Sequence, residues 1–363
     1  MNDRSAPAQS PPPAGKPAIW QSGWFNTLSR FAALVGVFLF FALLVEDGKF
    51  YTLRNLENIL RQSSVYATAA LGMTLVIIAA GIDLSVGSII ALCVVMIAWV
   101  LNLHYHTGGG QTQEVYLIQH WPVLLPILAV LVAVAAGVLA GMCNGAAIVG
   151  LRLVPFIVTL GSMGIFRGLA KGIAGERDIY PPEETWITTI MDPTLSSSDP
   201  AQRWMLLPPG VWILLVSALA AAALLRYTRL GRHIFAVGSN EETARLCGVP
   251  VGRTKIIVYT LAGFFAGLAG LMQFSFISGI GQPTTAIAYE LFVIAAVVIG
   301  GGSLMGGEGS ILGSVIGALV ITILYMGGQQ MGWAKWFQEM VIGAIIIGAV
   351  ALDQIRHRRI ARG

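Results

Sequence analysis

Two stretches of the sequence repeat one pattern: VIIAAGIDLSVGSII from Val76 to Ile90, and VVIGGGSLMGGEGSIL from Val297 to Leu312. Each begins with an apolar run, passes through a Gly- and Ser-rich break with one acidic residue, and ends in Gly-Ser-Ile and a new apolar run. Glycine clusters interrupt regular structure, so each stretch predicts two helices joined by a short break. Two interpretations of the match remain open: an internal repeat, which is typical of transporters, and chance similarity between apolar segments.

The residues that mark the breaks are Gly81 and Asp83 in the first and Gly302 and Glu308 in the second. Ionisable side chains inside a membrane are usually functional, but these two acids lie at helix junctions. An acid just before a helix can also cap its N-terminus. Because we find no Lys or Arg inside the membrane as an obvious partner, we favour a hinge or capping role for both acids over a proton relay.

The composition is that of a membrane protein. The chain has 363 residues, of which 56% are hydrophobic and 11% charged, and its mean hydropathy is +0.75. Soluble domains carry about 25% charged residues, so an ordinary soluble enzyme is disfavoured. A disordered chain and a nucleic-acid-binding protein are excluded more firmly, because both need charge that this sequence lacks. The odd count of three cysteines argues against a disulfide framework.

Ten apolar segments are candidates to cross a bilayer, which takes roughly 20 residues. They are residues 26–45, 62–80, 86–103, 122–145, 154–171, 210–227, 254–277, 289–301, 309–327 and 335–353. The eighth is short, which leaves open a tilted, broken or re-entrant helix. The sequence therefore predicts an all-α fold, a polytopic membrane helix bundle of about ten transmembrane helices over residues 26–355, preceded by a disordered cytoplasmic tail at 1–25.

The placement of Lys and Arg sets the orientation. With the N-terminus inside, most of the 22 basic residues lie on the cytoplasmic side, and the outer loops hold most of the acids. Both termini are therefore predicted to be cytoplasmic. The long outer loop at 172–209 has two open interpretations, a docking surface and a solvated connector. The loop at 228–253 is the most basic inner one.

Glycines recur at every fourth position in several segments. The sets are Gly137, Gly141 and Gly145; Gly164, Gly168 and Gly172; Gly309, Gly313 and Gly317; and Gly263 with Gly267. Small residues at this spacing allow helix backbones to approach closely in lipid. Both static packing and the sliding of moving helices require such surfaces. The pattern is therefore compatible with a transporter but is not specific to one.

The inner loop contains a short helix with defined ends. In SNEETARLCGVP, residues 239–250, Ser239 and Glu242 have the spacing of a capping box. Gly248, two residues before a proline, is a stop signal. The sequence predicts a two-turn helix from Asn240 to Cys247. Two roles are open on these residues alone: insertion into a groove of a cytoplasmic partner, and contact with anionic lipid.

The sequence carries no enzymatic motif. No ATP-binding loop of the form GxxxxGK[ST] occurs, because none of the lysines precedes Ser or Thr. A GxSxG nucleophile elbow is also absent, as is any Cys or His set with zinc-ligand spacing. We therefore expect no catalytic residue, no metal and no cofactor, and interpret the chain as a transport subunit without an ATP site of its own.

Polar residues inside otherwise apolar helices are candidates for the substrate path. They are Asn144, Thr159, Ser162, Gln273 and Ser275. Polar groups in spanning helices generally face protein or water. Pathway lining and interhelical hydrogen bonding are therefore both open as explanations for these five residues.

Four stretches taken together resemble the permease subunits of bacterial ABC importers for ribose, xylose, galactosides and similar sugars. They are LGMTLVIIAAGIDLSVGSI (71–89), NGAAIVGLRLVPFIVTLGSMGIFRGLA (144–170), GRHIFAVGSNEETARLCGVPV (231–251) and VVIGGGSLMGGEGSILGSVIGAL (297–319). They spread over almost all of the predicted membrane part. The N-terminal tail and the 172–209 loop do not carry the resemblance.

The resemblance implies a fold, partners and a location. Such permeases are ten-helix bundles of the bacterial inner membrane that form homodimers, associate with a cytoplasmic ABC ATPase subunit and receive sugar from a periplasmic substrate-binding protein. The 239–250 helix matches the family's coupling helix. ATPase coupling is thereby implied for Ser239, Asn240, Glu242, Arg245, Leu246 and Gly248. In this assignment Ser239 and Glu242 hold the helix, and Arg245 faces the partner.

The expected function is that of the membrane-spanning permease of an ATP-driven importer for a monosaccharide or related polyol. Two alternatives stay open: an ATPase-independent secondary carrier or facilitator, and a related amino-acid importer permease. A carrier needs an ion site or an open channel, and we find no convincing one in the sequence. The resemblance places high affinity mainly in the separate binding protein, so the sequence does not name the sugar.

Overall fold

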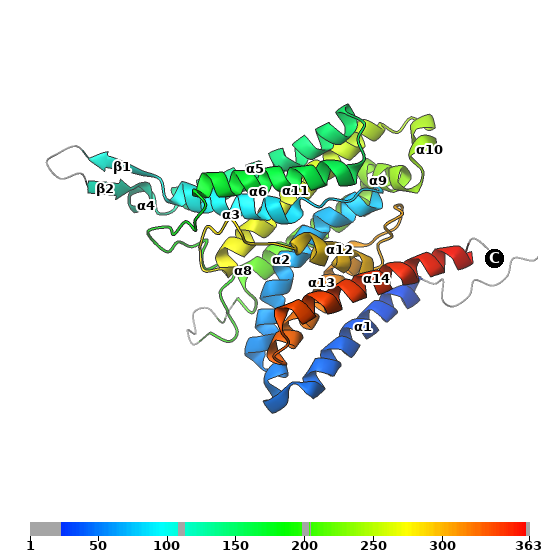
Figure 1. Cartoon of the computed structure of the whole chain (residues 1–363), viewed down its shortest axis with the longest axis horizontal. Helices are drawn as coiled ribbons and strands as arrows, with labels where there is room; N and C mark the ends of the chain where they lie inside the picture. Colours follow the sequence, from blue (N-terminus) through cyan, green and yellow to red (C-terminus); the bar gives the residue numbers. More distant parts are fainter. Residues whose placement is uncertain (1–22, 108–112, 198–202, 204, 361–363) are drawn as a thin grey trace, which may run out of the picture.

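The computed structural model of the chain describes residues 23–107, 113–197, 203 and 205–360, and these are predominantly helical (Figure 1). The ten principal helices are α1 (Gly23–Leu44), α2 (Leu53–Ile78), α3 (Val86–Leu101), α5 (Leu124–Gly150), α6 (Pro155–Ala174), α8 (Pro209–Tyr227), α11 (Val251–Phe276), α12 (Tyr289–Ile299), α13 (Ile311–Gln330) and α14 (Lys335–Ile360). Each predicted apolar segment overlaps one of them. Most of the predicted tail lies outside the described residues.

Several shorter elements were not predicted from the sequence. They are the 3-10 helix η2 (Glu46–Tyr51), the antiparallel hairpin of β1 (His104–Thr107) and β2 (Gln113–Tyr116), α4 (Leu117–His120), and the helix α9 (Arg229–Ser239) of the inner loop. The short inner helix that the sequence predicts over Asn240–Cys247 is present as α10 (Glu241–Leu246). The hairpin and α10 lie at opposite ends of the molecule (Figure 1).

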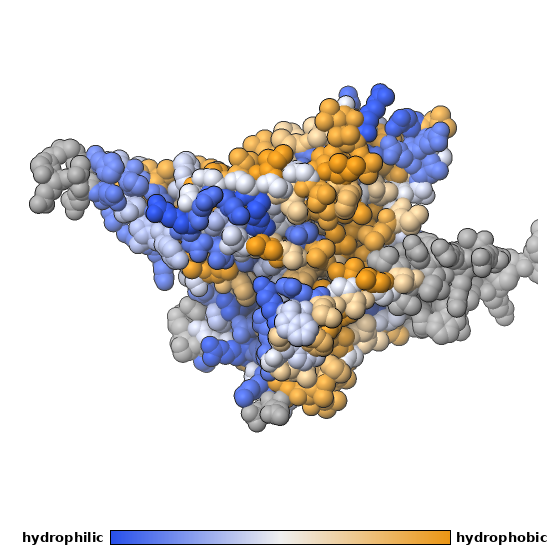
Figure 2. Space-filling model, in the orientation of Figure 1, coloured by the Kyte–Doolittle hydropathy of each residue, from blue (hydrophilic) through white to orange (hydrophobic). Residues whose placement is uncertain are grey.

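The surface between these two ends is apolar. Figure 2 shows hydrophobic residues over the middle of the molecule and hydrophilic residues at the hairpin end and at the α10 tip. Among the described residues, five helices, α5, α6, α8, α11 and α13, are long and apolar enough to cross a membrane. Shorter apolar helices include α3 and α12. The fold is therefore that of a polytopic helical membrane protein.

The regularly spaced glycines pack helices backbone to backbone. A Cβ on Gly141 of α5 would overlap the carbonyl oxygen of Tyr259 on α11, and a Cβ on Gly317 of α13 would overlap that of Ala296 on α12. Side chains cannot enter contacts this close. The α6 set differs, because a Cβ on Gly164, Gly168 or Gly172 would meet no described heavy atom within 4 Å.

The two breaks seen in the sequence have the same backbone structure. At the end of α2, the amide of Gly81 donates to the carbonyl of Val76 (2.9 Å), and at the end of α12 that of Gly302 donates to Val297 (2.8 Å). The residues before them, Ala80 and Gly301, have φ of +58° and +82°. This is the Schellman ending of a helix. Because α6 and α11 end in the same way, this ending is common to both breaks without deciding between an internal repeat and chance similarity.

The N-cap residues of the helices that follow the breaks are Ser85 and Ser310 rather than the two acids, so the capping alternative is wrong and the hinge alternative stays a prediction. Asp83 lies outside α3, and its Oδ1 accepts hydrogen bonds from Ser85 N (2.8 Å) and Ser85 Oγ (2.6 Å). The residue that caps α13 is Ser310, whose hydroxyl accepts from Gly313 N at 3.3 Å. Asp83 thus orders the first break locally, because a short acidic side chain readily bonds nearby backbone.

Candidate functional site

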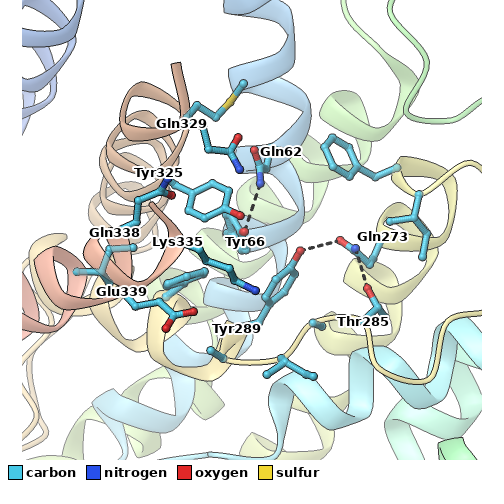
Figure 3. Close-up of a pocket in the computed structure, with 18 of the residues that line it drawn as sticks. Gln62, Tyr66, Gln273, Thr285, Tyr289, Tyr325, Gln329, Lys335, Gln338 and Glu339 are labelled. Carbon is cyan, nitrogen blue, oxygen red and sulfur yellow. Dashed lines mark hydrogen bonds between the residues drawn. The ribbon is translucent and has the colours of Figure 1, made fainter. Parts of the chain in front are cut away.

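A cavity of about 660 Å³ lies among α2, α11, α12, α13 and α14. Figure 3 shows polar and aromatic side chains from these helices around one space. The lining residues used below are Gln62 and Tyr66 of α2, Gln273 of α11, Tyr289 and Phe292 of α12, Tyr325 of α13 and Gln338 of α14. A cavity of this size is within the range of small-molecule sites.

One wall of the cavity is not helical. With 11 residues, α12 is about 16 Å long, roughly half of the hydrocarbon core of a bilayer. The preceding segment 277–288 lines the cavity, and Ser278, Ala286 and Ala288 in it have positive φ. Irregular backbone at membrane depth is tolerated where it is buried in protein or lines a water-filled cavity. This wall therefore fits a solvated pathway.

Arg167 of α6 holds this wall from outside. Its guanidinium donates from Nη1 to the carbonyl of Pro283 at 2.9 Å and to that of Thr285 at 2.6 Å. Charged donors form the stronger class of hydrogen bonds. The irregular segment is consequently fixed in place by Arg167 in addition to its own turn hydrogen bonds.

Neutral side chains bond to one another across the cavity. The amide of Gln273 donates to Thr285 Oγ at 3.0 Å, and its Oε1 accepts from the hydroxyl of Tyr289 at 3.2 Å (Figure 3). Gln62 donates to the hydroxyl of Tyr66 at 3.4 Å. Amides and hydroxyls both donate and accept. This lining therefore suits a ligand with uncharged hydroxyl groups.

Aromatic rings form the inner part of the cavity. The ring centroid of Tyr66 lies 4.7 Å from that of Tyr289 and 5.6 Å from that of Phe292, and Phe292 lies 6.0 Å from Tyr325. Tyr66, Phe292 and Tyr325 are the lining residues farthest along their helices toward the two breaks. Edge-to-face packing of this kind makes a rigid cluster, which closes the cavity on the side of the breaks.

Gln338 has an unsatisfied acceptor. Its Nε2 donates to the carbonyl of Trp333 at 2.8 Å, while its buried Oε1 has no hydrogen-bond partner in the described part of the chain. An unpaired buried acceptor costs about 1–3 kcal/mol. A hydroxyl donor from a ligand would remove this cost after a small movement of the side chain.

The outer loop is attached to the start of α2. Both oxygens of the Glu57 carboxylate accept backbone amides of the loop, from Thr194 and Leu195 (2.9 Å) on Oε1 and from Ser196 (2.9 Å) on Oε2. One turn further along α2, Arg61 donates from Nε to the carbonyl of Met191. The described loop residues 175–197 are therefore fixed beside the cavity, which Arg61 also lines.

The same loop is attached to the end of α11. The hydroxyl of Ser275 donates to the carbonyl of Thr188 at 2.8 Å and accepts the amide of Met191 at 2.8 Å. Ile179 and Gly281 form an antiparallel bridge. Burial raises the pKa of the Asp192 carboxyl in this loop, and nearby Arg61 opposes that shift. A simple solvated connector would not have these attachments.

Among the five predicted pathway residues, only Gln273 lines the cavity. Asn144 donates to Ser85 Oγ (2.8 Å), Thr159 to the carbonyl of Ile82 (3.2 Å), and Ser162 to that of Thr159 (3.2 Å). These side chains make interhelical or local hydrogen bonds, as does Ser275. The tyrosines of the lining were not predicted, although a Tyr inside an apolar run is a visible signal in the sequence.

The short inner helix forms, but its cap differs from the prediction. Ser239 is the last residue of α9, and Asn240 caps α10 by accepting the amide of Thr243 at 2.7 Å. The predicted capping box of Ser239 and Glu242 is therefore wrong, because α9 extends through Ser239. Gly248 has φ of +80°, as its predicted place after the helix requires.

Two residues of α10 project outward. Leu246 is 85% exposed and Arg245 has a side chain that is 69% exposed. Glu241 holds the helix by ion pairs with Arg245 (3.1 Å) and Lys255 of α11 (2.6 Å). A large exposed apolar side chain beside a cation is typical of a residue that enters a partner's pocket.

A polytopic helical bundle with a cavity lined by polar and aromatic side chains and with a projecting surface helix has the features of a membrane transport protein. Comparison with known proteins agrees: residues 55–350 match the family described as branched-chain amino acid transport system / permease component. The chain belongs to this permease family, and it is a multi-pass protein of the bacterial inner membrane.

Individual relatives are similar over most of their length. The chain is 38% identical to the ribose import permease protein RbsC of Escherichia coli K12 over 304 residues, covering 84% of this chain and 87% of the relative. It is 33% identical to the autoinducer 2 import system permease protein LsrC of Klebsiella pneumoniae (92% and 88% covered). Identity to the E. coli K12 xylose transport system permease protein XylH is 32% (97% and 100%). No solved structure matches the chain.

The carboxylate of Glu57 gives a direct test of the outer-loop attachment. We expect Glu57→Gln to lower the free energy of unfolding by about 2 kcal/mol, because an amide group then faces loop N–H donors and hydrogen bonds to a charged group are lost. Trypsin should cleave the loop faster in this variant. The control is Glu183→Gln, an exposed residue of the same loop. Equal cleavage rates and equal thermal unfolding of the two variants would contradict the attachment.

Proposed function

We propose that the chain is the membrane-spanning permease of an ATP-driven importer for a monosaccharide or related polyol. The observation that carries the proposal is the set of amides, hydroxyls and aromatic faces among the residues that line the cavity. The names of the ribose and xylose permeases support a sugar. The family description names branched-chain amino acids, and the charged residues Arg61, Lys335 and Glu339 also line the cavity, so an amino-acid permease stays the alternative.

The cavity opens away from the inner helix α10. The α2 residues that line the cavity end at Tyr66. From Tyr66 to the break at the end of α2 the helix runs about 18 Å further, at 1.5 Å per residue. An inner α10 therefore implies an outward-facing cavity. The proposal includes the predicted topology of about ten spans with both termini in the cytoplasm.

Two surfaces fit the partners that an importer of this kind requires. On the inner side, α10 with Arg245 and Leu246 would enter a groove of a separate ATPase. On the outer side, the attached loop 175–197 borders the cavity and would receive a periplasmic substrate-binding protein. Both surfaces are rigidly held by hydrogen bonds and ion pairs within the chain, which reduces the entropy lost on binding.

A second copy of the chain fits the open glycine face of α6. Gly164, Gly168 and Gly172 lie one turn apart, and a Cβ on any of them would meet no described atom. Large apolar side chains beside them, such as Ile165 and Leu169, are exposed. Small residues at this spacing are typical of helix pairing in lipid, which supports the proposed homodimer.

Reconstitution tests the transport function. The permease is placed in proteoliposomes with its ATPase and its binding protein, whose ligand is first found by thermal shift among pentoses, hexoses, polyols and leucine. We expect ATP-dependent uptake of a sugar or polyol. Gln273→Leu should reduce uptake at least tenfold, because it removes the amide that joins Thr285 and Tyr289.

The control for this variant is Gln119→Leu, an exposed Gln of α4 outside the cavity. Equal uptake by the two variants would contradict the role of the cavity. Uptake by the permease without the ATPase would instead support a secondary carrier, and leucine as the ligand would support an amino-acid permease.

The exposed face of α10 gives a second test. We expect Arg245→Glu, Leu246→Glu and Gly248→Val each to lower ATPase association and uptake by tenfold or more while membrane insertion is kept. The first two change the projecting side chains, and the third places a branched residue at positive φ. The control is Arg229→Glu, which makes the same charge change on the exposed start of α9. Full ATPase association of all three variants would refute the assignment.

A further inference from the structure

The two helix breaks and the end of α9 meet at one point. The amide of Gly307, in the second break, donates to the carbonyl of Ile78, where α2 ends (2.9 Å). Gly238 of α9 lies against both, since a Cβ there would overlap Ile78 O and lie 2.7 Å from Gly307 N. We call this contact the glycine junction and define it as residues 78–80, 306–309 and 238–239.

The contacts of the junction involve backbone on all three sides. A Cβ on Gly306 would lie 2.6 Å from Ala80 Cβ and 2.7 Å from the carbonyl oxygen of Gly238. A Cβ on Gly307 would lie 3.1 Å from Ser239 Cα. Backbone atoms cannot move aside to make room for an added Cβ, as the end of a flexible side chain can. The three segments are therefore close-packed, and displacement of one would push directly on the others.

The junction is connected to α10 on one side. Only Asn240 separates α9 from α10, and a small apolar cluster of Val237, Ala244 and Val251 joins α9, α10 and the start of α11. Ile234 and Val237 bury the inner face of α9. A force on α10 would therefore reach Gly238 through packed side chains rather than through a flexible linker.

On the other side, the junction is connected to the cavity. From the first break, α2 runs back to Tyr66, and from the second break α12 runs back to Tyr289 and Phe292. These residues form the aromatic cluster that closes the cavity. Both helices are continuous between the junction and the cluster, so they transmit displacement along their axes.

We propose that the end of α9 locks the two breaks together, and that α10, the glycine junction and the inner ends of α2 and α12 move as one body when a partner displaces α10. Gly238 and Gly307 are then positioning residues for transport, and the breaks are rigid joints rather than independent hinges. The proposal rests on the proposed importer function, and it names the structural path by which α10 reaches the substrate cavity.

A disulfide across the junction tests whether the contact stays closed during transport or opens. A Cβ on Gly307 would lie 3.4 Å from Ser239 Cβ, close to the roughly 3.5–4.5 Å that a disulfide spans. The variant is Ser239→Cys with Gly307→Cys, made with Cys143→Ser and Cys247→Ser to remove the exposed native thiols. It is assembled with ATPase and binding protein in proteoliposomes, and uptake of the cognate ligand is measured before and after oxidation.

We expect the oxidised complex to keep at least half of the uptake of the reduced complex, because the contact persists through the transport cycle. Because Gly307→Cys itself strains the junction, the reduced double variant is expected to transport less than the native complex, and only the ratio of oxidised to reduced uptake is interpreted. Uptake that falls below half on oxidation and returns with reductant would overturn the proposal, as would failure of the disulfide to form. Absence of ATP-dependent uptake in the unmodified complex as well would instead refute the importer function.

Gly238→Ala tests the junction without a cross-link. In complexes that copurify with the ATPase, we expect ATP hydrolysis to continue while uptake falls at least tenfold, because the added methyl group pushes α9 away from Ile78. The control is Gly36→Ala in α1, where a Cβ meets nothing within 4 Å. Uptake by Gly238→Ala within twofold of that control would overturn the proposal. A general loss of stability would reduce ATPase binding and hydrolysis together with uptake.

Discussion

The hydrogen bond from the amide of Gly81 to the carbonyl of Val76, repeated from Gly302 to Val297, is the constraint on which the rest of the bundle depends. A helix that ends among other helices must satisfy its last carbonyls internally. The Schellman ending does so with one residue of left-handed backbone, Ala80 after α2 and Gly301 after α12. It lets α2 and α12 stop at the same level, and there the two breaks contact each other.

Close helix contacts then arrange the remaining parts around these two ends. Glycines on α5 and α13 bring their backbones against α11 and α12. The short α12 leaves an irregular wall, and the cavity lies beside it. The outer loop is attached near one end of the molecule and α10 at the other, so that two exposed surfaces are held in fixed relation to the cavity between them.

Much of this arrangement follows from the sequence. The apolar segments predict the helices, and the interrupted stretches predict the breaks, because hydrophobic periodicity and Gly clusters are local signals. The sequence pattern predicts Ser239 rather than Asn240 as the cap of α10, because the residues of α9 are predicted as a loop. The buried face of α9, with Ile234 and Val237, is narrow and lies among basic residues.

The cavity depends on longer-range contacts, and of the predicted pathway residues only Gln273 lines it. Two of the predicted pathway residues, Asn144 and Thr159, instead donate hydrogen bonds to a side-chain and a backbone oxygen near the first break. Their burial and polarity do not distinguish that role from pathway lining. Tyr66, Tyr289 and Tyr325 come together only when α2, α12 and α13 are packed, and no spacing within one segment predicts that meeting.

The irregular wall at 277–288 has a consequence for how such a chain can diversify. A helical wall presents only side chains, since its peptide groups bond to each other. This wall instead turns through several left-handed residues and is fixed from outside by Arg167, so its length and sequence are less tied to helix packing. A change in the wall would reshape the cavity while leaving the glycine contacts of the bundle intact. Relatives that carry different cargoes can then share one framework.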